Sequence, residues 1–162
     1  MASGELLYEG KAKQIYSTGT DREYLIRYKD DATAFDGTKK GVIANKGIVN
    51  NRVSNLLFQL LEKEGIETHL IRAVDERHTL VKSLQIIPVE VVTRNVVAGS
   101  LAQRVGREEG FRLPMPIIEL YYKNDALHDP MINEYHARAM GWATQEQLES
   151  MQAQALKINE IL

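Results

Sequence analysis

The chain of 162 residues contains no cysteine. This absence excludes disulfide bonds, thiolate metal sites and a cysteine nucleophile, and it suits a reducing cytoplasm, where we expect the protein to act. No apolar run approaches the roughly 20 residues that span a bilayer. The first ten residues, MASGELLYEG, lack the basic segment and apolar core of a signal peptide. The sequence therefore predicts a soluble protein with no membrane partner.

Excess charge of one sign is also lacking, since the formal net charge is −2. A nearly neutral chain gives no bulk attraction for nucleic acid, so we expect no nucleic-acid partner and only local phosphate binding. Neither the Walker pattern GxxxxGK[ST] nor a GxSxG elbow is present. With 44% hydrophobic and 26% charged residues, the composition is that of a globular protein.

Strand patterns fill the first part of the chain, and helical patterns become more frequent later. The segments ELLYE, KQIYST and EYLIRY predict an antiparallel meander, and THLIRAV and HTLVKS predict two further strands. A helix is expected from Lys46 to Glu64, with Gly65 after its end. Residues 86–97, IIPVEVVTRNVV, predict a largely buried strand. The resulting fold class is α+β with two lobes, 1–85 and 86–162.

The last helix is expected to begin at a capping box formed by Thr144 and Gln147. Its apolar stripe continues to the end of the chain through Leu148, Met151, Ala155, Ile158 and Leu162. Because no helix-stop signal follows, we expect this chain to be the front portion of a longer protein. An apolar stripe without partners also predicts marginal stability or self-association, for example as a homo-oligomer.

The segment EGKAK, residues 9–13, has two interpretations. In a strand, Lys11 and Lys13 would share one face while Ala12 faces the other way, and Gly10 would let a ligand approach the backbone. Two ammonium groups beside backbone N–H groups make a candidate polyphosphate site. A charged hairpin edge explains the same residues, and the local pattern alone favours that second interpretation.

The segment PVEVVTRNVVAGS places Glu90 and Arg94 on one face of a strand. Charged side chains in a buried strand are paired or meet a ligand. One interpretation is a structural Glu90–Arg94 pair, and the other is a cleft where Arg94 binds a carboxylate or phosphate. The helix that follows begins near Ser100, which with Gln103 fits a capping box, and its free N–H groups also fit an anion site.

Two more segments carry polar residues with alternative interpretations. KNDALHDP contains Lys123 and Asp129, which fit either an Asx-type turn or a magnesium site that uses one carboxylate and substrate phosphates. Asp36, before a glycine, is a hairpin signal. Lys46 and Gly47 stand at a helix start, which is either an anion site or an ordinary beginning of a helix.

Taken together, LLYEGKAKQIY, FDGTKKGVIANKGIVNN, IIPVEVVTRNVVAGSLAQRVG and YYKNDALHDPMINEYHA resemble the phosphoribosylaminoimidazole-succinocarboxamide synthase (SAICAR synthetase) family of purine biosynthesis. The stretches occur in family order and cover nearly the whole chain. The resemblance implies an ATP-grasp or kinase-like fold with two lobes. It also implies an ATP-dependent ligase: ATP phosphorylates the carboxylate of carboxyaminoimidazole ribonucleotide, and the amine of L-aspartate then displaces phosphate to form an amide.

The resemblance further implies roles for individual residues, with ATP and Mg²⁺ as cofactors. The ATP-binding residues are expected to be Gly10, Lys11, Ala12, Lys13, Ile15, Lys82 and Ile86. The residues that bind the ribonucleotide are expected to be Asp36, Glu90, Arg94 and Ser100. The catalytic residues are expected to be Lys13, Lys123 and Asp129, and Asp129 is also the expected ligand of the metal.

The family pattern continues into motifs such as DFKLEFG and DEISPDxxRLWD, which supply magnesium-binding carboxylates and a further arginine. This chain has neither motif, so we expect it to be inactive alone. Two other hypotheses remain open. One is a non-catalytic module that binds a nucleotide or a phosphosugar, and the other is a kinase or ligase that acts on another carboxylate.

Overall fold

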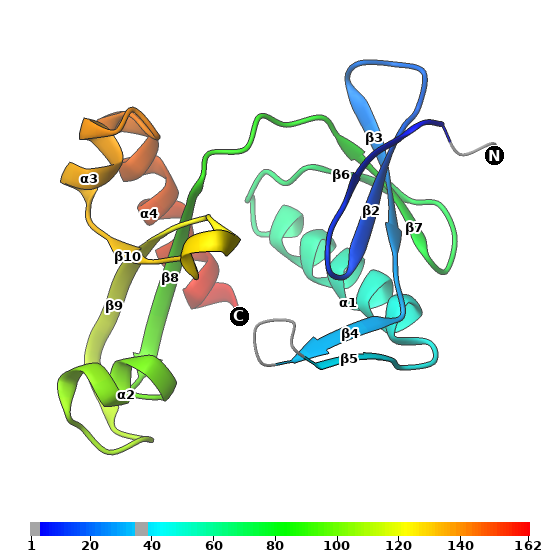
Figure 1. The fold of residues 1–162 in the computed structure, drawn as a ribbon. Helices are drawn as coiled ribbons and strands as arrows, with labels where there is room; N and C mark the ends of the chain where they lie inside the picture. Colours follow the sequence, from blue (N-terminus) through cyan, green and yellow to red (C-terminus); the bar gives the residue numbers. More distant parts are fainter. Residues whose placement is uncertain (1–3, 35–38) are drawn as a thin grey trace. The chain divides into compact units, whose positions relative to one another are not determined.

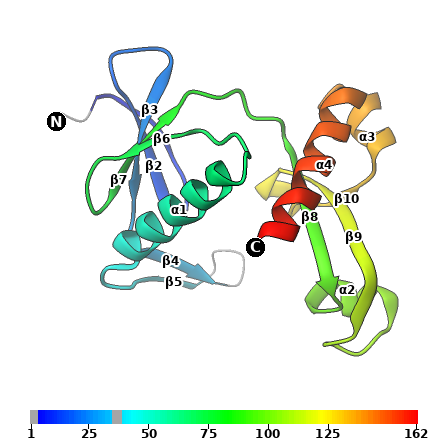
Figure 2. The same ribbon diagram turned by 180° about the vertical axis from the view of Figure 1, so that it is seen from behind.

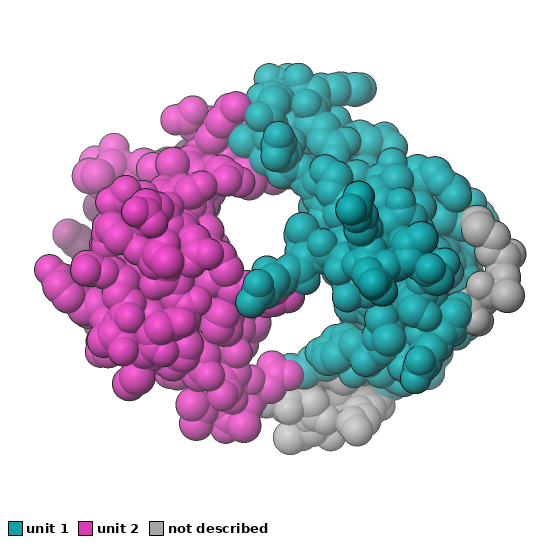
Figure 3. All heavy atoms as spheres, turned by 90° about the horizontal axis from the view of Figure 1, so that it is seen from above, with its two compact units in different colours: residues 1–85 teal, residues 86–162 magenta. Residues whose placement is uncertain are grey.

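The computed structural model describes residues 4–34 and 39–162 (Figure 1). The chain forms two compact units, residues 1–85 and residues 86–162, which Figure 3 shows in different colours. Each unit has its own sheet and its own apolar cluster. Over the described ranges, no helix is long and apolar enough to cross a membrane.

The first unit is built on a five-stranded antiparallel sheet with the order β1-β2-β3-β7-β6. Its strands are β1 (Leu6–Glu9), β2 (Lys13–Ser17), β3 (Glu23–Tyr28), β6 (Leu70–Ala73) and β7 (His78–Lys82). The predicted meander is confirmed, because β1, β2 and β3 pair in chain order. β4 (Asp31–Ala34) and β5 (Lys39–Val42) form a separate antiparallel pair. Asp36, a predicted site residue, lies outside the described residues.

Helix α1 (Lys46–Lys63) packs against β3, β6 and β7, and Gly65 follows its end with φ 76°. The helix and its glycine were predicted, and the buried residues of α1 include two asparagines as well as Leu61. Val49 and Val53 are about half exposed, whereas Asn51 and Asn55 are buried. The apolar spacing identified the helix, and the structure adds that two asparagines lie on its packed side.

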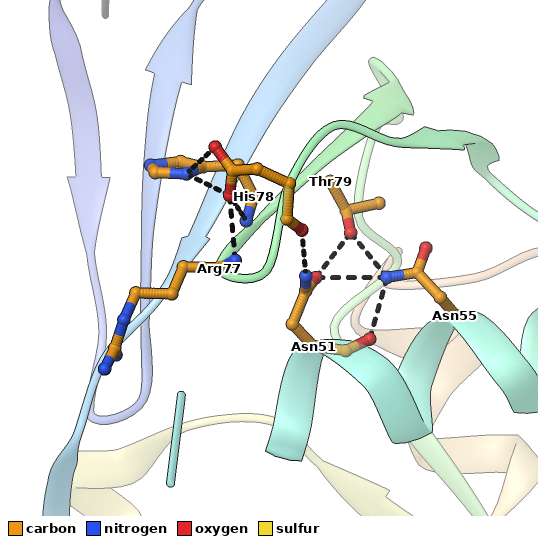
Figure 4. A network of polar contacts seen from close by, with 6 residues as sticks. Asn51, Asn55, Arg77, His78 and Thr79 are labelled. Atoms are coloured by element: carbon orange, nitrogen blue, oxygen red, sulfur yellow. Dashed lines mark hydrogen bonds and ion pairs between the residues drawn. The ribbon is translucent and has the colours of Figure 1, made fainter. Parts of the chain in front are cut away.

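A polar network explains why the side chains of Asn51 and Asn55 extend from α1 toward β7 (Figure 4). Asn55 Nδ2 donates to the hydroxyl of Thr79 on β7 over 2.7 Å, and that hydroxyl donates to Asn51 Oδ1 over 2.6 Å. Asn51 Nδ2 also donates to the backbone oxygen of Asp75 over 2.9 Å. Hydrogen bonds of the Asn51 amide and of Asn55 Nδ2 offset much of the cost of burying these groups, although Asn55 Oδ1 is buried without a hydrogen bond to any described residue.

The second unit combines a three-stranded antiparallel sheet of order β10-β9-β8 with helices of different lengths (Figures 1 and 2). Its strands are β8 (Val89–Val96), β9 (Arg112–Tyr122) and β10 (Met131–Ile132). Its helices are α2 (Gly99–Val105), the 3₁₀ turn η1 (Asp125–Leu127), α3 (Glu134–Ala139) and α4 (Gln145–Ile161). The main apolar cluster of the unit is made by Val89, Leu120, Ala137, Ala143 and Leu148.

Helix α4 begins as predicted, because Thr144 and Gln147 form both bonds of a capping box. The start of its apolar stripe packs well, with Leu148 fully buried, whereas Leu162 is 65% exposed. The strand expected to be largely buried is not: within β8 only Val89 is buried. β8 is an edge strand, and one face of its sheet carries charged side chains.

Candidate functional site

The segment EGKAK forms a tight turn between β1 and β2 rather than a continuous strand. Gly10 N donates to Lys13 O over 2.8 Å, and Ala12 O accepts from Lys29 N over 2.9 Å. Lys11 lies in the turn and Lys13 is the first residue of β2. The predicted shared face of the two lysines is therefore wrong, because residues two apart share a face only inside a strand. Lys13 Nζ lies 5.3 Å from the ring centre of Tyr28, a cation–π contact.

A hollow of about 460 Å³ lies beside this turn within the first unit. It is lined by Gly10, Lys11, Lys29, Asp31, Ala32, Gly41 and Val42. Lys29 Nζ contacts Asp31 Oδ2 at 2.5 Å and Glu9 Oε1 at 2.6 Å. Hydrogen bonds to Asp31 and Glu9 raise the pKa of Lys29. They therefore favour the charged ammonium form, which is paired with these two carboxylates. Gly10 and Lys11, which were predicted to bind the phosphates of ATP, thus line the same hollow as residues of β4 and β5.

The three residues predicted to surround adenine occupy different environments. Ile15 is half-buried in β2, with Ile26 as its cross-strand partner. Lys82 ends β7, and its Nζ donates to Thr68 O over 3.2 Å. Ile86 belongs to the second unit and is 77% exposed. The sheet of the first unit therefore carries Ile15 and Lys82 but not Ile86.

His69, which the sequence analysis did not select, lies near this part of the sheet. Its backbone oxygen accepts from Lys82 N over 2.7 Å, and its ring meets Phe58 of α1 edge-on with centres 4.9 Å apart. Burial lowers the pKa of His69, and the nearby charges of Lys13 and Lys82 lower it further. The imidazole is consequently biased toward its neutral form.

A backbone N–H group at the beginning of α1 is hydrogen-bonded to the carboxylate of Asp30. Gly47 N donates to Asp30 Oδ1 over 2.8 Å, and Arg77 binds both oxygens of Asp30 over 2.7 and 3.0 Å. The Arg77 hydrogen bond, followed by that of Gly47, lowers the pKa of Asp30 to about 2. Of the two interpretations of Lys46 and Gly47, the geometry supports the ordinary helix start, because Asp30 satisfies its N–H group.

The sheet of the second unit has one apolar and one charged face. Cross-strand pairing sets Glu90 opposite Tyr121 and Val92 opposite Glu119. Since alternate residues of a strand share a face, these four side chains and Arg94 lie on the same side. Val89 and Leu120 lie on the other side, in the apolar cluster with α3 and α4. Two predicted substrate residues, Glu90 and Arg94, are thus brought to one face.

Arg94 pairs with Glu119 and not with Glu90. Arg94 Nε donates to Glu119 Oε2 over 2.7 Å, Arg104 of α2 contacts Glu119 Oε1, and the Tyr121 hydroxyl donates to Oε2 over 2.7 Å. The predicted Glu90–Arg94 pair fails because four residues along a strand span about 13 Å, whereas Glu119 lies on the adjacent strand. The Glu119 hydrogen bond, followed by that of Tyr121, raises the pKa of Arg94.

Lys123 joins Glu90 to Asp129. Its Nζ lies 2.7 Å from Asp129 Oδ2 and 3.3 Å from Glu90 Oε2, and these hydrogen bonds, Asp129 first, raise the pKa of Lys123. Asp129 Oδ1 also accepts from Asn124 N over 2.8 Å. Asn124 Oδ1 accepts from Ala126 N over 3.1 Å, which is the predicted Asx-type turn. Three predicted site residues therefore form one ion-pair chain.

Ser100 lies at the start of α2 but does not cap it. The N-cap residue is Ala98, which makes no side-chain cap bond, so the predicted capping box is wrong. The first N–H of the helix, at Gly99, donates to Glu109 Oε1 over 2.8 Å. Ser100 Oγ lies 3.5 Å from Arg94 Nη2 instead. The hydroxyl therefore belongs to the environment of the arginine.

Sequence reasoning missed Glu119, Arg104 and Tyr121. The first and last of these stand in the β-rich run 117–122, IIELYY. Glu119 carries the same signal as Arg94, a charged residue within a β-rich run of apolar residues. Nothing in the sequence indicated a functional role for Arg104, because arginine is a common residue on the exposed side of a short helix.

The described residues do not form a metal-binding site made of protein side chains alone. Among them, no group of three or more His, Asp or Glu side chains is placed to hold a metal ion. Asp129 offers a single carboxylate, and this fits only a Mg²⁺ ion that takes its other ligands from phosphates and water, which is a usual arrangement for Mg²⁺.

Comparison with known proteins identifies the family. A family model described as SAICAR synthetase matches residues 6–162. The chain belongs to the SAICAR synthetase family. The phosphoribosylaminoimidazole-succinocarboxamide synthase of Desulfitobacterium hafniense is 57% identical over 159 residues, which are 98% of this chain and 67% of that protein.

Solved SAICAR synthetases have the same mixed α/β fold. The crystal structure of the enzyme from Ehrlichia chaffeensis matches with a TM-score of 0.93 and 44% identity, over 97% of this chain and 66% of that one. A SAICAR synthetase in complex with ADP matches with a TM-score of 0.91 and 50% identity, again over 97% and 66%. The chain thus spans about two thirds of the length of the SAICAR synthetases it matches.

Proposed function

We propose that the protein to which this chain belongs is an ATP-dependent ligase of purine biosynthesis. It transfers phosphate from ATP to the carboxylate of carboxyaminoimidazole ribonucleotide, and the amine of L-aspartate attacks the resulting acyl phosphate. An amide forms, and phosphate leaves. Membership of the SAICAR synthetase family supports this reaction. We place the protein in the cytoplasm, in an ATP-grasp-like fold of two lobes.

The observation that carries the proposal is the charged face of β8 and β9. Glu90, Arg94 and Ser100 lie along it with Lys123. We assign Arg94 and Ser100 to the phosphate of the ribonucleotide, because a guanidinium group and a hydroxyl both donate to phosphate oxygens. We assign Glu90 to the imidazole end of the same ligand.

The phosphates of ATP are assigned to the turn of Gly10, Lys11 and Ala12, together with Lys13. A tight turn that contains glycine exposes backbone N–H groups, and lysine neutralises phosphate charge. The ADP complex of a relative with 50% identity supports nucleotide binding. In the proposed site, Ile15 and Lys82 of the first unit contact the adenine, and Asp36 contributes to substrate binding.

Lys123 and Asp129 are assigned to the transfer step. Asp129 would hold a bound Mg²⁺ ion, which would supply positive charge to neutralise the phosphates. Lys123 would hold Asp129 in place through the 2.7 Å ion pair and present an ammonium group to the transferred phosphate. Since the relatives are longer than this chain, we propose that further ligands come from the part of those proteins that has no counterpart here.

Calorimetric titration of ADP into the chain tests the nucleotide site. We expect Lys11→Ala to weaken binding about 10-fold, the loss of one charge-assisted hydrogen bond. Lys63→Ala, the same change at the end of α1, should leave binding unaltered. Equal ADP affinity in all three proteins would contradict the assignment of the turn.

Release of ADP that requires both L-aspartate and the ribonucleotide tests the reaction. We expect this activity from the complete protein and none from the 162-residue chain. Turnover by the chain alone would refute the need for further ligands. Ligand binding without turnover in the complete protein would favour a non-catalytic binding module instead.

A further inference from the structure

Glu119 is a carboxylate in the interior of the second unit, with its side chain only 3% exposed. It accepts from Arg94 Nε and Tyr121 Oη at Oε2, each over 2.7 Å, and contacts Arg104 through Oε1. Both oxygens are therefore engaged by donors. Burial alone raises the pKa of Glu119, but the hydrogen bonds of Arg94 and Tyr121 and the two guanidinium charges outweigh it and lower the pKa.

The charges of this cluster do not cancel. Arg94 and Arg104 each carry one positive charge, and Glu119 carries one negative charge. The side chains of Arg94 and Arg104 are 22% and 37% exposed, so both still reach the surface of the unit. A cluster with one unbalanced positive charge at a partly exposed surface attracts an anion.

The geometry also limits how Arg94 can turn. Its Nε is held by Glu119 over 2.7 Å, which restricts the rotation of the guanidinium group. Its Nη2 lies 3.5 Å from Ser100 Oγ, a distance at the outer limit of a hydrogen bond. A guanidinium group fixed through Nε still presents its Nη donors to a ligand. Glu119 therefore contributes orientation as well as charge.

We infer that Glu119 is a positioning residue: it holds Arg94 and Arg104 together so that both guanidinium groups face the phosphate of a phosphosugar ligand beside Ser100. This assigns Arg104 to the anion site as its second cation. The inference rests on the ribonucleotide site of the proposed function. A plain structural ion pair would instead stabilise the unit without affecting any one ligand.

The test measures dissociation constants by calorimetry for the 162-residue chain with three ligands: ribose 5-phosphate, carboxyaminoimidazole ribonucleotide and ADP. Glu119→Gln keeps the size of the side chain and removes its charge. Glu119→Asp keeps the charge and serves as the conservative variant. Glu76→Gln is the matched control, because Glu76 also binds an arginine, Arg52, over 2.6 Å, but at an exposed position of the first unit.

We expect Glu119→Gln to weaken ribose 5-phosphate about 10- to 100-fold, as for the loss of one or more charge-assisted hydrogen bonds. ADP affinity should stay unchanged, Glu119→Asp should recover part of the loss, and Glu76→Gln should match the unaltered chain. If Glu119→Gln does not fold, Tyr121→Phe takes its place, since it removes one bond that orients Glu119. We then expect a smaller, selective loss of ribose 5-phosphate affinity.

Other outcomes separate this inference from the proposed function. Unchanged ribose 5-phosphate affinity in Glu119→Gln, or an equal loss of ADP affinity, overturns the positioning role. No binding of ribose 5-phosphate by the unaltered chain overturns both the role and the ribonucleotide site. Selective weakening, combined with a ribonucleotide that binds no more tightly than ribose 5-phosphate, supports the role and overturns the proposed substrate.

Discussion

Replacing Leu148 by alanine tests whether the second unit has a core of its own. Leu148 is fully buried and packs with Val89, Leu120, Ala137 and Ala143. The change removes three carbon groups, worth about 2.4 kcal/mol of transfer free energy at ~0.8 kcal/mol each. The cavity left behind increases the loss to about 3–5 kcal/mol. For a unit of this size, that corresponds to a fall in melting temperature of more than about 12 °C.

Urea denaturation and amide hydrogen exchange measure this effect. The free energy of unfolding should fall by the stated amount, and amides of β8 should exchange faster while those of β3 keep their protection. Leu127→Ala is the matched control, because Leu127 is 57% exposed and should lose less than about 1 kcal/mol. Equal loss of protection in β3 and β8 would refute the reasoning, since it would mean that the two sheets unfold as one.

Two further predictions concern the start of α1. Gly47→Ala should destabilise the chain by about 1–2 kcal/mol in a urea titration, although alanine favours helices, because its Cβ would lie 2.5 Å from Tyr28 O; a gain in stability would disprove the close contact. Folding lowers the pKa of Asp30 to about 2, so its carboxylate contributes stability that is present above about pH 4 and is lost as the pH falls toward 2. Urea midpoints of Asp30→Asn should therefore lie below those of the unaltered chain at pH 6 and approach them near pH 2, and a difference that does not change with pH would contradict this linkage.

Periodicity predicted most elements of the fold but fewer of the packed faces. The alternating segments of the first 30 residues became β1 to β3, and the box at Thr144 began α4. The pattern did not indicate that Asn51 and Asn55 lie on the inner side of α1, because these residues gain hydrogen bonds that no apolar spacing records. Whether a side chain is buried depends on all the residues that it contacts in the folded chain. The local sequence does not show which residues those are.

The candidate site shows the same limit at the level of side chains. Glu90 and Arg94 were selected correctly as polar residues on one strand face, yet each pairs with a residue from elsewhere in the chain. Their partners, Glu119 and Lys123, come from β9 and the residue just after it, and strand register decides which side chains meet. Local spacing identified charged residues that need a partner, and only the pairing of strands could say which partner each one has.

The same pairing changes where phosphate recognition is expected. Both helix starts that the sequence offered as anion sites donate a backbone N–H group to a carboxylate of the chain, at Gly47 to Asp30 and at Gly99 to Glu109. A helix start already neutralised in this way has less attraction left for a ligand. Lysine and arginine side chains do not share this restriction, since a guanidinium group bound through one nitrogen still offers others. Phosphate binding by this protein is therefore expected to depend on the Lys11 turn and on Arg94 more than on helix dipoles.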